Sequence, residues 1–176
     1  NTASITTEQV DPNPGNNTAT EDILVTRSSL EGLVFEDRDR AAGNGGTQQT
    51  VTGEPGIAGV TVVLTGTDLY GNAVNLTLPT AADGAYRFEN LSPSDASGYT
   101  ITQTQPAGYV NGPIDPPAAG GSAPSLGGTY AAGSPNSVIS AIPVGANQAG
   151  VRYNFPEVRQ PSLSGFVYVD ANFSNV

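Results

Sequence analysis

Residues 57–65 read IAGVTVVLT, a run in which apolar and polar side chains alternate. Val60, Val62 and Leu64 fall on one side of an extended chain, and Thr61 and Thr65 fall on the other. Because successive side chains of a β-strand point to opposite faces, the run predicts a strand with one buried face.

Similar short runs lie on both sides of this strand. No window of the chain has the apolar spacing of an amphipathic helix. Residues 82–84 (Ala-Asp-Gly) indicate a tight hairpin, and the Gly/Pro/Ala/Ser-rich stretch 113–137 indicates a long loop. The predicted fold is therefore an all-β sandwich of about seven strands. Strands are expected at 23–26, 30–35, 57–65, 74–78, 86–88, 99–102, 138–142 and 151–155.

The composition is that of an exported, acidic protein. The formal net charge is −10, which repels nucleic-acid phosphates and anionic membranes and favours divalent cations. The chain has no Cys, no His and, since all six basic residues are Arg, no Lys. We expect an extracellular protein, at a bacterial cell surface or secreted, that does not insert this segment into a membrane.

The missing residue types exclude most catalytic chemistry. Without His, Cys or Lys the chain cannot form Ser-His-Asp or Cys-His catalytic groups, a Schiff base or a His/Cys zinc site. A glycosidase needs only two carboxylates across a sugar cleft, and sixteen acids make some close pair inevitable. We predict that the protein is not an enzyme.

One stretch of the chain occurs twice. Residues 29–39 read SLEGLVFEDRD, and residues 162–172 read SLSGFVYVDAN. The two copies share Ser, Leu, Gly, Val and Asp at matching positions. The second copy predicts that a further module begins near residue 161.

Four motifs resemble a known family in the same order along the chain. They are 30–39, 53–62 (GEPGIAGVTV), 83–88 (DGAYRF) and 104–109 (TQPAGY), and 153–155 followed by Glu157 and Val158 resembles the closing strand. The family is the B-repeat of serine–aspartate repeat surface proteins, which is related to the collagen-adhesin B-type domain. Residues 1–27 resemble the last strands of an uncharacterised immunoglobulin-like repeat of bacterial envelope proteins.

The resemblance implies a domain plan and a fold. Residues 1–27 end a preceding repeat, 28–160 form one complete B-repeat-like domain, and 161–176 begin a following repeat. The implied fold is a prealbumin-like or immunoglobulin-like β-sandwich of about seven strands, with an extra partial strand segment at each end. The isopeptide bond of collagen-adhesin relatives requires a lysine, which this chain lacks.

The resemblance also implies a calcium site. Asp37 and Asp39 follow a strand, Glu54 precedes Pro-Gly as in the family, and Asn44 is the nearest further oxygen ligand. Calcium binds six to eight oxygen ligands. The loop 41–52 is longer and poorer in acids than the family's loop. The alternative is therefore a solvated acidic loop with no metal.

The sequence is compatible with four functions. The first is a structural spacer or stalk module in a large repetitive adhesin-like protein. The second is a protomer that pairs with neighbouring modules or copies through β-strand edges, which would build a head-to-tail filament. The third is a binding module that uses the acidic loop or residues 113–137. The fourth is a carboxylate glycosidase.

Overall fold

The computed structural model describes residues 2–4, 18–20, 27–38, 53–112, 124–130, 137–165 and 169. Every regular element in these ranges is a β-strand. Near the N-terminus, β1 (Thr2–Ser4) pairs antiparallel with β2 (Thr18–Thr20). The strand expected at 23–26 lies outside the described residues. Within those residues no helix is long and apolar enough to cross a lipid bilayer.

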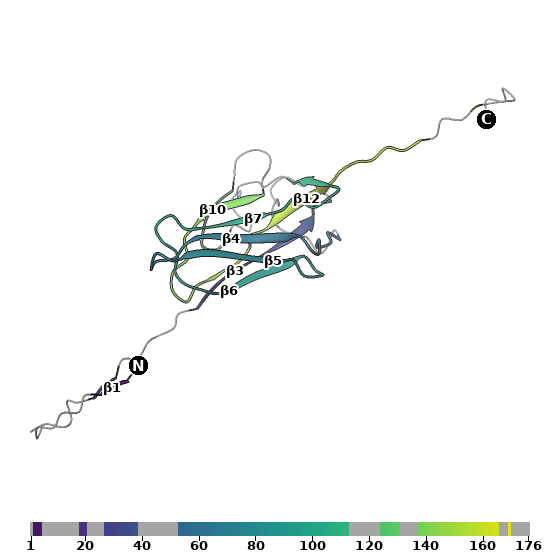
Figure 1. Cartoon of the computed structure of the whole chain (residues 1–176). Helices are drawn as coiled ribbons and strands as arrows, with labels where there is room; N and C mark the ends of the chain where they lie inside the picture. The colour runs from purple at the N-terminus through teal and green to yellow at the C-terminus, as the bar shows by residue number, and fades with distance from the viewer. Residues whose placement is uncertain are drawn as a thin grey trace, which may run out of the picture.

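The described residues between Ser28 and Arg159 fold into two facing sheets (Figure 1). Seven of the strands have five or more residues and three have two or three, which confirms the predicted class of an all-β sandwich with about seven main strands. The strands are β3 (Ser28–Glu36), β4 (Thr61–Thr67), β5 (Ala73–Pro79), β6 (Ala85–Leu91), β7 (Tyr99–Gln103), β8 (Tyr109–Asn111), β9 (Thr129–Tyr130), β10 (Val138–Ile142), β11 (Ala149–Gly150) and β12 (Phe155–Arg159).

The two sheets differ in their pairing. In one the order is β5–β4–β7–β10–β9, and every described pair is antiparallel. In the other, β3 is central: β6 pairs with it antiparallel, whereas β11 and β12 pair with it in parallel. β8 completes this second sheet beside β12. The first and last strands of the sandwich are therefore direct neighbours.

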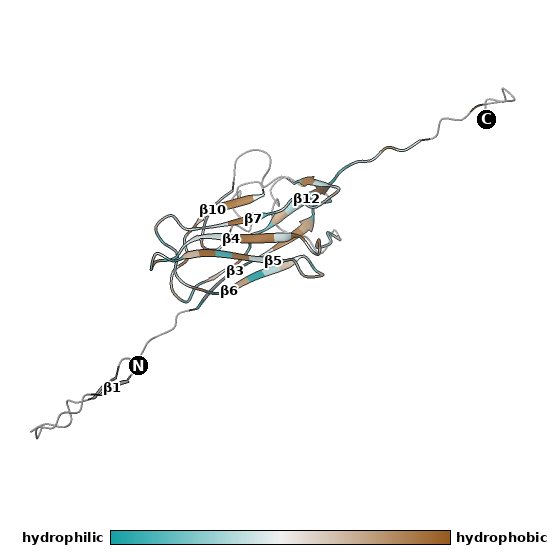
Figure 2. Ribbon diagram, viewed as in Figure 1, coloured by the Kyte–Doolittle hydropathy of each residue, from teal (hydrophilic) through white to brown (hydrophobic). Residues whose placement is uncertain are grey.

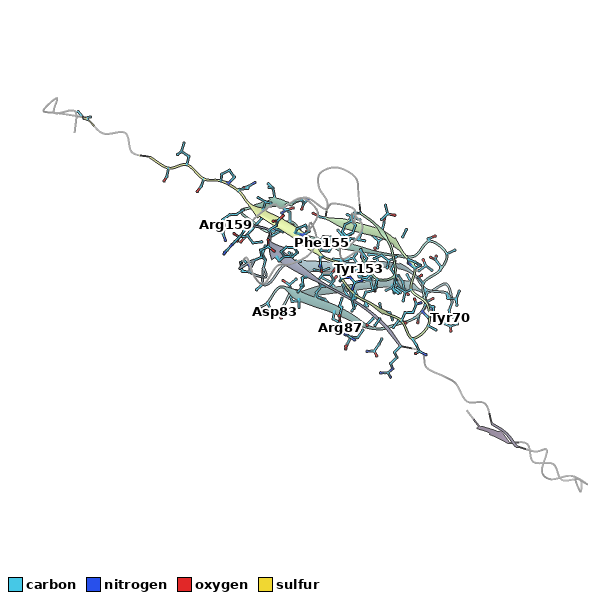
Figure 3. The ribbon with its side chains drawn as sticks, turned by 180° about the vertical axis from the view of Figure 1, so that it is seen from behind. Tyr70, Asp83, Arg87, Tyr153, Phe155 and Arg159 are labelled. Atoms are coloured by element: carbon cyan, nitrogen blue, oxygen red, sulfur yellow. The ribbon has the colours of Figure 1, made fainter. Side chains whose placement is uncertain are left out.

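The core lies between the sheets and consists of buried apolar side chains. Figure 2 marks the hydrophobic residues along the strands in brown. Val60, Val62 and Leu64 are buried, and Thr61 is exposed, as the alternation predicts. Leu30 and Val34 of β3 are fully buried. Figure 3 shows Tyr70 and Arg159 at opposite ends of the sandwich.

Three details of the sequence prediction are wrong. The turn at residues 82–84 forms, but its flanking strands belong to different sheets, because β5 pairs with β4 and β6 pairs with β3. The last strand covers Phe155–Arg159 rather than 151–155. Thr129–Tyr130, inside the stretch expected to be a loop, pairs with β10 as β9.

Candidate functional site

The end of β3 is held by the segment that carries the Gly-Glu-Pro-Gly motif. The amide of Glu36 donates to the carbonyl of Pro55 at 2.9 Å, and the amide of Ile57 donates to the carbonyl of Val34 at 2.8 Å. Gly56 lies so close to the β5–β6 turn that a Cβ there would overlap the carbonyl of Asp83. The motif is thus required for close backbone packing beside β3.

Two of the four candidate calcium ligands, Asp37 and Glu54, lie near this end of β3. Asp37 and Glu54 are each only 5% exposed. The amide of Arg38 donates to Glu54 Oε1 at 3.3 Å, and the amide of Asp37 donates to the carbonyl of Glu157 at 2.8 Å. The structure therefore places Asp37 and Glu54 at the same end of β3. Both carboxylates are buried rather than solvated.

The other two candidates, Asp39 and Asn44, lie outside the described residues. Among the residues that are described, no three acids, histidines or cysteines are grouped closely enough to hold a metal ion. The described part supplies two carboxylates of the kind that calcium prefers. A complete site would need further oxygen ligands from residues outside the described ranges or from water.

A second charged cluster lies at the same end of the sandwich, and the sequence did not indicate it. Glu36, 6% exposed, accepts from Arg159 Nη2 at 2.7 Å, Arg38 Nε at 3.1 Å and Tyr109 Oη at 3.1 Å. The Arg159 guanidinium also lies 5.1 Å from the Tyr109 ring centre. Its hydrogen bond is the main reason that the pKa of Glu36 falls to about 2, against the opposing effect of burial. This cluster ties β3, β8 and β12 together.

Glu157 is also a buried acid, but its pKa is raised whereas that of Glu36 is lowered. It is fully buried on β12, and its carboxylate accepts a hydrogen bond from the Gln105 side chain. Burial raises the pKa of Glu157 to about 7, although hydrogen bonds from Gln105 and Gln103 oppose the shift. Its position in the closing-strand motif was recognised from sequence, but its burial was not.

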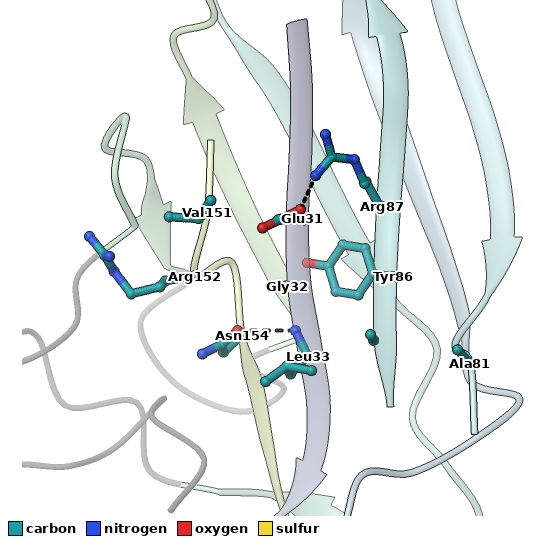
Figure 4. Close-up of a pocket in the computed structure, with 10 residues that line it drawn as sticks. Glu31, Gly32, Leu33, Ala81, Tyr86, Arg87, Val151, Arg152 and Asn154 are labelled. Carbon is teal, nitrogen blue, oxygen red and sulfur yellow. Dashed lines mark hydrogen bonds and ion pairs between the residues drawn. The ribbon is translucent and has the colours of Figure 1, made fainter. Parts of the chain in front are cut away.

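A hollow of about 590 Å³ opens beside β3 (Figure 4). Its lining is mostly apolar, and the Glu31–Arg87 ion pair lies at its side. Glu31 is the single carboxylate among its described lining residues. Since both glycosidase mechanisms use two facing carboxyl groups, this hollow does not provide that chemistry.

The hollow exists because the parallel ladder beside β3 is interrupted. Between β11 and β12, Arg152 takes a positive φ of 69°, and the chain bulges away from β3. The Asn154 side chain bridges the gap, with its Oδ1 accepting from the amide of Leu33 at 3.0 Å. The amide of Tyr153 still donates to the carbonyl of Glu31 at 3.2 Å. Although the regular pairing is interrupted, these two hydrogen bonds still join β3 to the segment between β11 and β12.

Comparison with known protein families supports the resemblance that the sequence motifs indicate. Residues 28–121, more than half of the chain, match the family model of the SdrD B-like domain. No curated protein sequence matches the chain. SdrD B-like domains are structural modules of adhesin-type bacterial proteins that are surface-anchored or secreted. The chain therefore belongs to the SdrD B-like domain family.

Proposed function

We propose that residues 28–160 form a load-bearing spacer module in a long adhesin-like protein at the bacterial surface or in the secreted fraction. The observation that carries this proposal is the position of the two ends of the sandwich. β3 starts at one end and β12 finishes at the opposite end, and both run in the same direction (Figure 1). Such a module adds its full length to a stalk.

The pairing of these two strands also suits a module under tension. Pulling on the start of β3 and on the end of β12 loads the bonds between them in shear, so that many must break together. The bonds on this side of β3 run from Ser29, whose amide donates to the carbonyl of Gln148 just before β11 at 3.0 Å, to Asp37, whose amide donates to the carbonyl of Glu157 in β12 at 2.8 Å. The register between them includes Phe155↔Val34 and Glu157↔Glu36.

No catalytic role forms part of this proposal. The absence of His, Cys and Lys supports a structural role. The charged groups at the end of β3 make hydrogen bonds that join strands, which is also what a spacer needs.

The end-to-end geometry can be tested with distance labels. The chain has no Cys, so Arg27→Cys and Gln160→Cys would carry the only two labels. A nine-residue strand spans about 30 Å at the usual rise per residue. We expect one narrow distance distribution at or above that length. A short or broad distribution would contradict the spacer geometry.

We further propose that calcium stiffens the module through Asp37, Asp39, Glu54 and Asn44. The two buried carboxylates, Asp37 and Glu54, support this. They fit the ion in charge and chemistry, and a bound cation would balance two acids at one strand end. These ligands, through the ion that they share, would then link the end of β3 to residues 39–54.

Thermal unfolding in calcium and in excess chelator tests this site. We expect calcium to raise the midpoint of the wild type, because an ion that binds only the folded state stabilises it. Glu54→Gln should lose that response. Glu89→Gln, which alters an acid with a 61% exposed side chain on β6, should keep it. A wild-type midpoint that is the same in calcium and in chelator would exclude the site.

A second candidate function is a filament assembled head to tail by strand addition. It is favoured by the apolar side chains beyond β12, since Leu163 is fully exposed and Val169 is 92% exposed. Exposed strand-forming segments are templates for pairing with another chain.

A further inference from the structure

β5 is an open edge of the sandwich. It lies at the end of its sheet and, among the described strands, pairs with β4 alone. Five of its seven residues are exposed. Figure 1 shows β5 beside β4, running along the length of the sandwich. A strand at the end of a sheet presents backbone N–H and C=O groups to which another strand can bind.

The ladder between β4 and β5 fixes which backbone groups face the open side. The amide of Thr80 donates to the carbonyl of Val60 at 2.9 Å, which continues the register of the two strands by one pair. Hydrogen-bonded pairs alternate along an antiparallel ladder, so Leu76 directs its amide and carbonyl toward β4. Asn75 and Thr77 direct theirs to the open side. The edge thus offers a donor and an acceptor on each side of Leu76.

The other sheet ends in the described part carry features that block such pairing. Charged side chains, short strands and register shifts all protect an edge. β6 carries Arg87 and Glu89 with exposed side chains, and its register with β3 shifts between Ser28 and Leu30. β8, β9 and β11 have only two or three residues. β5 has seven residues, no charge, no register shift and a proline only at its last position.

β5 also leaves part of the core uncovered. Leu76 lies opposite the fully buried Leu64, so its side chain is on the core face of the sheet. Leu76 is nevertheless 41% exposed. Val74 and Leu78, on the same face, pack against the core and are only partly buried. A further strand beside β5 would cover this apolar face.

We propose that β5 pairs antiparallel with β5 of a second copy of this chain, about a two-fold axis at Leu76. Leu76 is the central residue of β5, and the edge is complementary to itself. Such pairing sets Leu76 opposite Leu76, Val74 opposite Leu78, and Asn75 opposite Thr77. Apolar side chains then meet on the core face and polar side chains on the outer face. A two-fold contact of this kind closes at two copies.

Charge favours a second copy over a basic partner. A basic protein or peptide would bind through acidic groups, and β5 has none. Because β5 is uncharged, two copies can pair without placing like charges directly opposite each other. The net charge of −10 on each copy still repels at long range, and salt screens that repulsion. Pairing should therefore strengthen as the salt concentration rises, whereas binding of a basic partner would weaken.

The contact is small, which sets its expected strength. One pair of seven-residue strands buries less surface than the interface of a permanent dimer, so we expect a dissociation constant between about 10 µM and 1 mM. In a protein with many such modules the same contact would recur, and the recurring contacts would reinforce one another. The proposal is independent of the spacer function. Together, the two would let stalks that run in opposite directions associate side by side.

Sedimentation of the full-length chain over a concentration series up to about 1 mM, at low and high salt, tests the pairing. We expect a monomer–dimer equilibrium that shifts toward dimer in high salt. A chain that stays monomeric at about 1 mM in high salt would overturn the proposal. Growth into species without a defined size would equally contradict a contact that closes at two copies.

Charge-swap variants at Leu76 test the axis. Leu76→Lys and Leu76→Glu should each weaken dimerisation at least about tenfold, because like charges meet where two leucines did. Mixing the two variants should restore a dimer, which also shows that both are folded. Val110→Lys is the matched control, since Val110 is 44% exposed on β8 of the other sheet, and it should dimerise like the wild type. A mixture no more dimeric than its two components would contradict the axis at Leu76.

Cross-linking tests the register. The chain has no cysteine, so Leu76→Cys supplies a single thiol. At the axis two such residues form a non-hydrogen-bonded pair with Cα atoms about 4.5 Å apart, which a disulfide can bridge. Asn75→Cys would instead face Thr77 of the other copy. In a mild oxidant Leu76→Cys should link several-fold faster than Asn75→Cys, and the reverse order would contradict this register.

These measurements are separate from the end-to-end distance that tests the spacer function. A monomeric chain with the expected distance between residues 27 and 160 would remove the pairing and leave the spacer in place. A dimer with a short or broad distance would do the opposite.

Discussion

Glu36 and Glu157 are partners in the register of β3 and β12, yet their pKa values move in opposite directions. Glu36 has two arginines and a tyrosine hydroxyl as partners, so its pKa falls to about 2. Glu157 has glutamine amides near it, and burial raises its pKa to about 7. Charged partners, rather than burial alone, decide which of two buried acids is stabilised in its ionised form.

This contrast predicts how stability depends on pH. The folded-state pKa of Glu157, about 7, exceeds its reference value of 4.5. The contribution of Glu157 to the free energy of unfolding is therefore complete below pH 4.5 and is lost as the pH rises through 7. The loss amounts to about 3 kcal/mol for a shift of this size. Glu36 behaves in the opposite way: its contribution is present above pH 4.5 and is lost as the pH falls through 2.

Replacing Glu157 isolates its effect. Glu157→Gln keeps a hydrogen-bonding side chain but removes the ionisation. Between pH 5 and pH 8, in chelator, we expect the wild type to lose more unfolding free energy than Glu157→Gln. Denaturant melts at several pH values measure this difference. Parallel curves for the two proteins would show that Glu157 does not titrate in this range.

The sequence predicts some of these residues but not their environment. Asp37 and Glu54 were selected from the family motifs, and the structure brings both to the end of β3. Glu36 and Glu157 were not selected as important. Apart from Arg38, which is two residues from Glu36, the partners lie between 52 and 123 residues away along the chain, and no local pattern reveals such pairs.

At the scale of the elements, alternation predicted the strands whose two faces differ. Val60 and the following residues of β4 as far as Leu64 show the burial that their alternation predicts. The last strand was misplaced because the parallel ladder breaks at Arg152, and pairing resumes at Phe155 despite the proline at 156. Pro156 has no amide hydrogen to donate, but its carbonyl accepts a hydrogen bond from the amide of Gly112 at 2.7 Å.

The shortest strands could not be predicted from sequence. β8 and β9 contain three and two residues, too few for an alternating pattern. They exist because β12 and β10 offer an edge to pair with. In the same way, the parallel pairing of β3 with β12 joins segments from opposite ends of the domain, which local sequence does not specify.

At the scale of the whole molecule, the direction of the chain links the fold to its proposed role. The domain begins with β3 at one end and finishes with β12 at the other. Because these strands are parallel neighbours, tension along the chain acts along their shared ladder. The cluster of Glu36, Arg159 and Tyr109 lies at the end of that ladder where the chain leaves.

Single-molecule pulling in two directions tests this account most directly. Handles at Arg27→Cys and Gln160→Cys load the β3–β12 ladder in shear, whereas handles at Arg27→Cys and Asn147→Cys pull from one end and open the ladder bond by bond. Asn147 is exposed and lies next to Gln148, which binds the start of β3. We predict a several-fold higher unfolding force for the first pair. Equal forces in both directions, or a lower force end to end, would contradict a load-bearing role.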